Sequence, residues 1–181
     1  MGRHRERHRR RSIRLKDYDY AQDGAYFVTV CTDEKRCIFG DIVDGQMRLN
    51  SLGCIVRDEW LKTANLRKYV TLDEFIVMPN HMHGIIFIAC RGVLQYAPTT
   101  RIEFRSPAQT IGAIVRGFKS AVTKRINELR GSPGVPIWQR NYYEHVIRND
   151  DDLNEIRDYI SDNPLKWHLD KENPNTLRTN L

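Results

Sequence analysis

The order of hydrophobic and polar residues along the chain predicts a series of short strands and amphipathic helices. Residues 26–32 are apolar or β-branched at most positions, which is typical of a central strand with both faces covered. Asp44 and Gly45 separate two further strand-like segments, 39–43 and 46–49. This pair favours a tight hairpin turn, so we expect the two segments to lie antiparallel.

A helix is expected after the hairpin, since Asn50 or Ser51 can cap it and apolar residues continue near helical spacing to about Leu66. Two strands are then predicted, at 72–78 and 81–89. The polar segment 91–105 lacks a clear period and is interpreted as a loop.

The second predicted helix has a strong start signal at Ser106, Pro107 and Gln109, in which the serine caps and the glutamine closes a capping box. Apolar residues then recur every three or four positions as one stripe: Ile111, Val115, Phe118, Val122, Ile126 and Leu129. Four basic residues lie off this stripe: Arg116, Lys119, Lys124 and Arg125. We expect them to contact the backbone of DNA, and a merely solvated face is the alternative.

A strand is predicted over 137–148, followed by a last helix that opens at Asn149 or Asp150 and stops at Pro164. Strands joined both by hairpins and by helices indicate the α+β class. The expected architecture is an antiparallel sheet with helices packed on one face.

Length and composition are those of a single globular domain, with 181 residues, 40% hydrophobic and 29% charged. The predicted division is a basic arm at 1–16, a catalytic domain at 17–168 and a C-terminal tail at 169–181. No apolar run is long enough for a membrane span, and the N-terminus does not resemble a secretory signal, so we expect a cytoplasmic protein without a membrane partner. The four cysteines form no C-x-x-C pair, which argues against a zinc ribbon or a redox motif.

A net charge of +6 and a pI of about 9.2 favour a polyanionic partner, although solubility alone also accounts for the charge. The arm at 1–16 is rich in arginine and has little apolar surface to pack. It can follow a phosphate backbone or remain a solvated tail.

His81 and His83 are two residues apart on a predicted strand, so both side chains lie on the same face. Two imidazoles in this arrangement can converge on one metal ion, and Pro79-Asn80 just before them would open that end of the strand to ligands. Two half-buried histidines beside a turn are the alternative.

The last predicted helix carries Tyr159 and Asn163 four residues apart, one turn above each other on one face. Leu153, Ile156 and Ile160 form the apolar stripe beside them. Tyr159 is therefore either a nucleophile at the edge of the stripe or an amphipathic residue at the boundary of the core.

Aromatic and basic residues alternate in the strand predicted at 137–148. One face carries Arg140, Tyr142 and Glu144, and the other carries Tyr143 and His145. Aromatic rings interleaved with arginine can stack on bases and bind phosphates, so Arg140 joins the predicted DNA-binding residues. A sheet strand with one polar face explains the same pattern.

Four motifs occur in an informative order: YFVTVCT at 26–32, VMPNHMHG at 77–84, WQRNYYEHVIR at 138–148 and YISDNP at 159–164. Together they resemble the REP-associated tyrosine transposases, relatives of the single-tyrosine insertion-sequence transposases within the HUH endonucleases. The resemblance covers roughly residues 13–167. It implies a ferredoxin-like sheet in which a central strand carries the two histidines with a hydrophobic residue, Met82, between them.

The resemblance also implies the chemistry. Tyr159 corresponds to the nucleophile, Asn163 to a third metal ligand beside His81 and His83, and Mg²⁺ or Mn²⁺ to the metal, although imidazoles also suit zinc. The implied reaction nicks and joins single-stranded DNA at hairpin-forming repeats, through a 5′-phosphotyrosine and a free 3′-hydroxyl. A homodimer is left open.

Tyrosine needs help to ionise, and Glu144 and His145 are the candidate bases by sequence. Tyr142 and Tyr143 remain alternative nucleophiles. A non-catalytic protein that binds DNA hairpins, or a small RNA-binding protein, would explain the charge and the sheet aromatics, but neither would need the histidine pair and the tyrosine together.

Overall fold

The computed structural model describes residues 23–89 and 110–176. The predicted arm at 1–16, the predicted loop at 91–105 and the predicted helix start at Ser106–Gln109 lie outside these residues.

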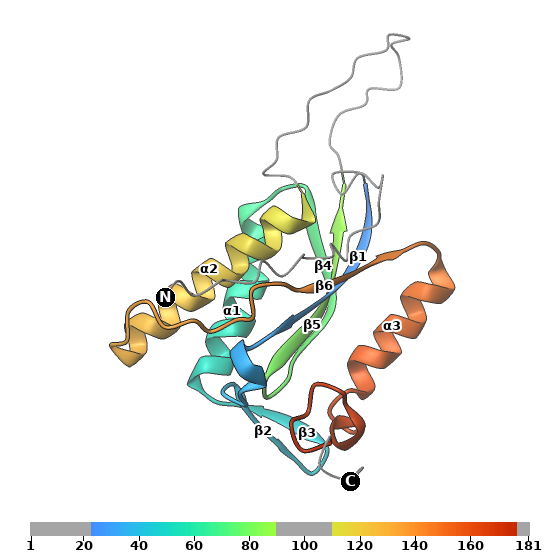
Figure 1. Ribbon diagram of the computed structural model, residues 1–181. Coiled ribbons are helices and arrows are strands. Elements are labelled where there is room, and N and C mark those ends of the chain that lie inside the picture. Colours follow the sequence, from blue (N-terminus) through green and yellow to red (C-terminus); the bar gives the residue numbers. More distant parts are fainter. Residues whose placement is uncertain (1–22, 90–109, 177–181) are drawn as a thin grey trace, which may run out of the picture.

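The centre of the molecule is a four-stranded antiparallel sheet (Figure 1). Its strands are β1 (Gly24–Cys31), β4 (Val70–Val77), β5 (His81–Ile88) and β6 (Tyr143–Ile147), in the order β4-β5-β1-β6. β1 and β5 are thus the two central strands, and β4 and β6 are the edges. Thr29 of β1 pairs with His83 of β5 on one side and with Tyr143 of β6 on the other.

The connections between these strands give the ferredoxin-like arrangement. A hairpin of β2 (Gly40–Val43) and β3 (Gln46–Leu49) and the helix α1 (Ser51–Leu66) lead from β1 to β4, and α2 (Ile111–Arg130) leads from β5 to β6. The hairpin turn is the predicted one, since Asp44 and Gly45 both have positive φ, 53° and 71°. The predicted α+β class with an antiparallel sheet is confirmed.

Helices lie on both faces of the sheet (Figure 1). α1 and α2 cover one face together, as predicted, whereas α3 (Asp150–Asp162) packs on the opposite face. Apolar residues on both faces of β1 make this necessary, because Phe27 and Ala25 point away from α1 and α2 and are covered by Ile160 of α3. The expectation of helices on one face therefore holds for α1 and α2 and not for α3.

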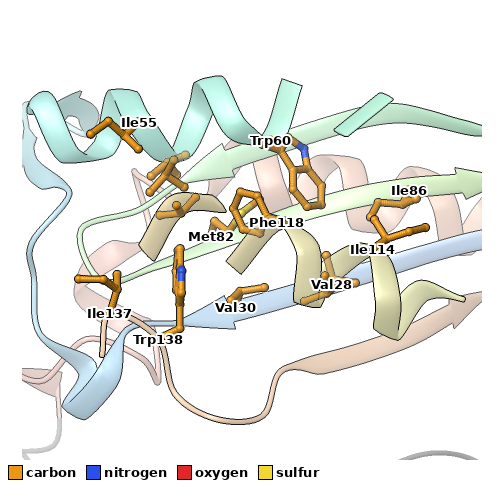
Figure 2. Close-up of a cluster of buried hydrophobic side chains, with 14 of the residues drawn as sticks. Val28, Val30, Ile55, Trp60, Met82, Ile86, Ile114, Phe118, Ile137 and Trp138 are labelled. Carbon is orange, nitrogen blue, oxygen red and sulfur yellow. The ribbon is translucent and has the colours of Figure 1, made fainter. Parts of the chain in front are cut away.

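The larger core lies between the sheet and the pair α1–α2 (Figure 2). Trp60 of α1 is fully buried and packs edge-on against Phe118 of α2, with ring centroids 5.2 Å apart. Gly84 of β5 makes this packing fit, because a Cβ placed there would lie 2.4 Å from the Trp60 ring. The central strand therefore approaches the tryptophan as closely as a glycine permits.

α3 is fixed on its own face by a cap, an apolar stripe and an ion pair. The Asn149 side chain accepts a hydrogen bond from the Asp152 amide and starts the helix. The predicted stripe packs on β1 and β5 through Ile160, with Leu153 and Ile156 beside it. Arg157 forms an ion pair with Asp73 of the edge strand β4, so α3 spans the sheet from β6 to β4.

Two predicted boundaries are wrong. α2 begins at Ile111 with Thr110 as its N-cap, and Leu129 in its last turn is 59% exposed rather than part of the buried stripe. The strand predicted over 137–148 is shortened to Tyr143–Ile147. Before β6 the pairing continues as an isolated bridge between Thr32 and Trp138, and the ammonium of Lys119 binds the carbonyl oxygens of residues 139, 140 and 141 at 2.5–3.3 Å.

Two short 3-10 helices complete the described chain, at Asp33–Lys35 and Trp167–Leu169. None of the helices in the described residues has the length and apolar character that crossing a membrane requires.

We predict that Gly84→Ala destabilises the protein by about 1–3 kcal/mol, because the new methyl group overpacks the Trp60 ring in a core that cannot expand. Denaturant unfolding followed by circular dichroism measures this loss. Gly134→Ala is a control for glycine in general, because its added Cβ meets nothing within 4 Å, although its positive φ of 82° adds a small backbone strain. Equal stability of Gly84→Ala and the wild type would contradict the packing argument.

Candidate active site

His81 and His83 are the first and third residues of β5 and point to the face that α3 covers. Their side chains are almost completely buried, at 0% and 2% exposed. The two Nε2 atoms lie 3.0 Å apart. The pleat thus brings both ring nitrogens to one point, as the sequence analysis expected of a metal-binding pair.

Asn80 fixes the tautomer of His81. The Asn80 amide nitrogen donates to the carbonyl oxygens of Lys35 and Glu172, at 3.0 and 2.7 Å, so its Oδ1 faces His81. Since Oδ1 can only accept, Nδ1 of His81 donates to it at 2.9 Å, and Nε2 carries the lone pair. The residue before the histidines therefore orients the His81 ring, in the way that outer-shell groups orient histidines that bind a metal.

The second histidine is positioned from β1, where Thr29 Oγ1 lies 2.9 Å from Nδ1 of His83. Burial lowers the pKa of His81 to about 4 and that of His83 well below its usual value. Both rings are therefore neutral at physiological pH, which is the form that binds a metal.

Asp170 brings a carboxylate to the pair. Its Oδ2 lies 3.7 Å from Nε2 of His81, and its side chain is 5% exposed. Ligand atoms of His81, His83 and Asp170 all lie within 4.8 Å of one another. These three residues form a group that could hold a metal ion.

Unsatisfied polar atoms favour this interpretation. Oδ2 of Asp170 and Oδ1 of Asn163 are buried and have no hydrogen-bond partner among the described residues. A buried carboxylate oxygen without a donor is costly, and a cation beside it removes the cost. Two imidazole nitrogens and a carboxylate oxygen are a donor set that divalent cations accept.

Tyr159 lies beside this group. Its hydroxyl is 3.3 Å from Nε2 of His83, and its ring meets the His83 and Phe27 rings edge-on, at centroid distances of 5.1 and 6.1 Å. The residue is 42% exposed, so one side of the ring remains open to solvent. Partial burial raises the pKa of the phenol, and a hydrogen bond from Asn163 opposes that rise.

The two alternative tyrosines lie differently. Tyr142 donates to Glu144 at 2.5 Å and packs against the core under α1 and α2, on the far face of the sheet from the histidines. Tyr143 lies on the histidine face, where its ring contacts Phe27 edge-on at 6.3 Å. Of the three tyrosines, Tyr159 is the one whose hydroxyl contacts the histidine pair in the described residues.

Neither base suggested by the sequence reaches Tyr159 by a hydrogen bond in the described residues. Glu144 pairs with Val28 in the sheet and so points to the opposite face. His145 is on the correct face, but its Nε2 is bound to the carboxylate of Asp152, at 3.0 and 3.2 Å, in the first turn of α3. The geometry therefore does not support either residue as the base for Tyr159, because alternation turns Glu144 to the other face and Asp152 binds the His145 ring nitrogen.

The chain after α3 packs against the site, although the sequence analysis treated 169–181 as a tail. The Trp167 ring lies 5.9 Å from that of His81, and Glu172 forms an ion pair with Lys35 at 3.2 Å. The Cys31 thiol also donates to Glu172, and burial raises its pKa to about 12. Sequence reasoning missed Asp170 because no local pattern marks a ligand that arrives with an irregular segment.

The predicted DNA-binding residues separate into two groups. Arg116, Lys124 and Arg140 line a groove of about 780 Å³ between α2 and the segment before β6, and all three are exposed. Lys119 lines it too but is engaged with backbone carbonyls. Arg125 lies elsewhere and forms an ion pair at 2.7 Å with the buried Glu59 of α1. The groove lies on the α2 side of the sheet, away from Tyr159.

No protein-family model matches the chain. An uncharacterized protein of Haemophilus influenzae is 44% identical over 170 residues, which are 91% of this chain and 93% of that protein. Among solved structures, a REP-associated tyrosine transposase bound to a REP hairpin matches with a TM-score of 0.53 and 21% identity, over 88% of this chain and 77% of that one.

A second solved structure, of a Deinococcus radiodurans protein named as a transposase, has 18% identity over 82% of this chain and 95% of that one. Its TM-score of 0.42 is too low to support a conclusion.

We predict that Mn²⁺ stabilises the protein and that the effect depends on His81, His83 and Asp170. At a metal concentration about 100 times Kd, binding adds about 2.7 kcal/mol to the free energy of unfolding. Thermal unfolding with and without Mn²⁺ should show this gain in the wild type, none in His81→Ala, and a reduced gain in Asp170→Asn. Asp158→Asn is the matched control, because Asp158 is an exposed aspartate of α3. An equal gain in all four proteins would contradict a metal site at these residues.

Proposed function

Because the chain belongs to one family with the Haemophilus influenzae protein and has the fold of the REP-associated tyrosine transposases, we propose that it is a metal-dependent tyrosine nuclease of single-stranded DNA. The observation that carries the proposal is the 3.3 Å contact between the Tyr159 hydroxyl and Nε2 of His83. A nucleophile type and a metal-ligand type meet at a half-open surface, where a phosphate can approach both.

In the proposed reaction Tyr159 is the nucleophile. Its phenol oxygen attacks a DNA phosphorus, an oxygen–phosphorus bond forms, and the bond from that phosphorus to the 3′ oxygen of the preceding nucleotide breaks. The product is a 5′-phosphotyrosine and a free 3′-hydroxyl. The phosphoester retains the energy of the broken bond, so a later 3′-hydroxyl can rejoin the strand without another energy source.

Residues around the tyrosine prepare this attack. Asn163 hydrogen-bonds to the phenol oxygen and opposes part of the rise in its pKa that burial causes. Phe27 and His83 hold the ring from two sides and so limit its orientations. A phosphate that binds here would meet a preoriented oxygen.

His81, His83 and Asp170 would hold the metal, with Asn163 as a further ligand, and we propose Mg²⁺ or Mn²⁺. When bound, such an ion would neutralise charge on the phosphate as a Lewis acid. Asn80 and Thr29 keep the two imidazoles in position for this role.

We further propose that the substrate carries a hairpin. The REP-associated tyrosine transposase of the same fold is bound to a REP hairpin. In this chain the groove with Arg116, Lys124 and Arg140 would contact the phosphate backbone on one side of the sheet, while Tyr159 lies on the other. A folded DNA element and the single strand next to it would then occupy different faces, joined around the β6 edge.

A protein that binds DNA hairpins without cutting them is the second candidate. The buried Asp170 segment over His81 is compatible with it, because that segment limits access to the histidines from one side. Covalent trapping of DNA on Tyr159 separates this candidate from the nuclease.

We predict that Tyr159 becomes covalently joined to a hairpin-bearing single-stranded oligonucleotide in the presence of Mn²⁺. Tyr159→Phe should form no adduct, because it keeps the ring packing and removes only the hydroxyl. Gel separation of the adduct and mass spectrometry of the digested protein identify the residue.

Tyr143→Phe is the matched control, since it removes a hydroxyl from a neighbouring ring on the same face. An adduct on Tyr143, or an undiminished adduct in Tyr159→Phe, contradicts the assignment. A wild-type protein that binds the oligonucleotide and forms no adduct supports the non-catalytic candidate.

The salt dependence of DNA binding tests the groove. Replacing Arg116 and Lys124 by glutamine should weaken binding to all sequences about equally and flatten the slope of log K against log salt by about 0.9 per lost contact, the value for the duplex stem of a hairpin. Arg125→Gln is the comparison, because its ion pair with Glu59 predicts lower stability and an unchanged slope. An unchanged slope in the double variant would show that these basic residues are solvated and do not contact DNA.

A further inference from the structure

An aromatic ring stands exposed on the histidine face of the sheet and has no role in the reaction proposed above. Tyr143 is the first residue of the edge strand β6, and 49% of it is exposed. Alternation along β6 turns its side chain to the same face as Thr29, which contacts His83. β6 is an edge strand that pairs with β1 alone among the described strands, and its first side chain is half exposed.

The ring of Phe27 connects Tyr143 to the proposed reacting groups, because it contacts both Tyr143 and Tyr159. Phe27 touches Tyr143 edge-on, with centroids 6.3 Å apart, and the same ring stacks on His83 at 5.3 Å. Phe27 also supports Tyr159 at 6.1 Å. Tyr143 and Tyr159 thus flank one buried phenylalanine, and a chain of nucleotides that crosses Tyr159 along this face would reach Tyr143.

A positive charge accompanies the exposed ring. Nζ of Lys171 lies 5.8 Å from the centre of the Tyr143 ring, and the residue is exposed. The same ammonium is near enough to both histidines to lower their pKa values. Lys171 forms no ion pair with a carboxylate in the described residues, so its charge is available to an anion.

An aromatic ring beside a cation can bind one unpaired nucleotide through its base and its phosphate. The face of an aromatic ring accepts any base, and a lysine ammonium binds the adjoining phosphate as a point charge. A base within a duplex is already stacked on both sides and is not free to add a third partner.

We propose that Tyr143 and Lys171 form a nucleotide subsite next to the reacting phosphate, where the Tyr143 ring stacks on an unpaired base and Lys171 binds its phosphate. This subsite rests on the proposed function. It makes single-strandedness a requirement of the site itself, independent of any sequence that the protein recognises elsewhere.

In this subsite the ring of Tyr143 binds the base and its hydroxyl has no role. A nucleophile needs its hydroxyl, whereas a stacking platform needs only its ring, so replacement by phenylalanine and by leucine should have different effects. Tyr143→Phe keeps the platform and Tyr143→Leu removes it at similar bulk. For the cation, Lys171→Met keeps the stem and removes the charge, and Lys166→Met is the matched control in the same segment.

The test measures binding of a hairpin-bearing single strand by fluorescence anisotropy, in a Tyr159→Phe background that prevents cleavage. The oligonucleotide carries an abasic site at each position in turn around the reacting phosphate. We expect one abasic position to weaken binding roughly tenfold, and Tyr143→Leu to weaken binding to the intact strand by a similar factor. The two losses should not add, because both remove the same stack.

Further results support the subsite: Tyr143→Phe binds like the parent, Lys171→Met binds more weakly than Lys166→Met, and duplex affinity is equal in all variants. The proposal is overturned if Tyr143→Leu binds the single strand as tightly as the parent does. It is also overturned if each abasic position weakens binding to Tyr143→Leu by the same factor as it weakens binding to the parent. Thermal unfolding shows whether each variant is folded. If Tyr143→Leu is unstable, the comparison of Lys171→Met with Lys166→Met tests the subsite instead.

The outcome can be separated from that of the proposed function. If Tyr159 forms its adduct normally and Tyr143→Leu changes nothing, the nuclease stands and the subsite falls. If the wild type neither binds single strands nor forms an adduct, both fall together.

Discussion

The pleat of β5 is the constraint on which the rest of the structure depends. Successive residues of this central strand point to opposite faces, so His81 and His83 face α3 while Met82 and Gly84 face α1 and α2. A shift of one residue in its pairing with β1 would exchange the faces and bury the histidines under Trp60. The packing of Trp60 on Gly84 therefore holds the register that the site requires.

The histidine face receives its remaining groups from the end of the chain. α3 brings Tyr159 and Asn163, and the segment after it brings Asp170 and Lys171. The ion pair of Arg157 with Asp73 and the contacts of Glu172 with Lys35 fix these two parts on the sheet. The site is thus a rigid central strand supplemented by a helix and an irregular segment, each anchored separately.

Local patterns were sufficient for much of this arrangement. The turn at Asp44 and Gly45 and the shared face of the histidines follow from turn chemistry and strand alternation, and both occur as expected. Long-range packing decided the rest. Lys119 looked like a DNA contact because it lies off the apolar stripe, yet it binds three carbonyl oxygens distant in sequence. Asp170 could not be identified at all, since nothing near it in sequence shows that the chain returns to His81.

The proposed mechanism requires one metal ion and one tyrosine to act on the same phosphate. The most direct measurement is a crystal structure of the Tyr159→Phe protein with Mn²⁺ and a hairpin-bearing oligonucleotide, in which anomalous scattering locates the manganese. We expect one anomalous peak in contact with Nε2 of His81 and of His83, with a DNA phosphate between that peak and the ring at position 159. A manganese ion bound elsewhere, or a DNA strand whose phosphates all lie away from the two histidines, would contradict it.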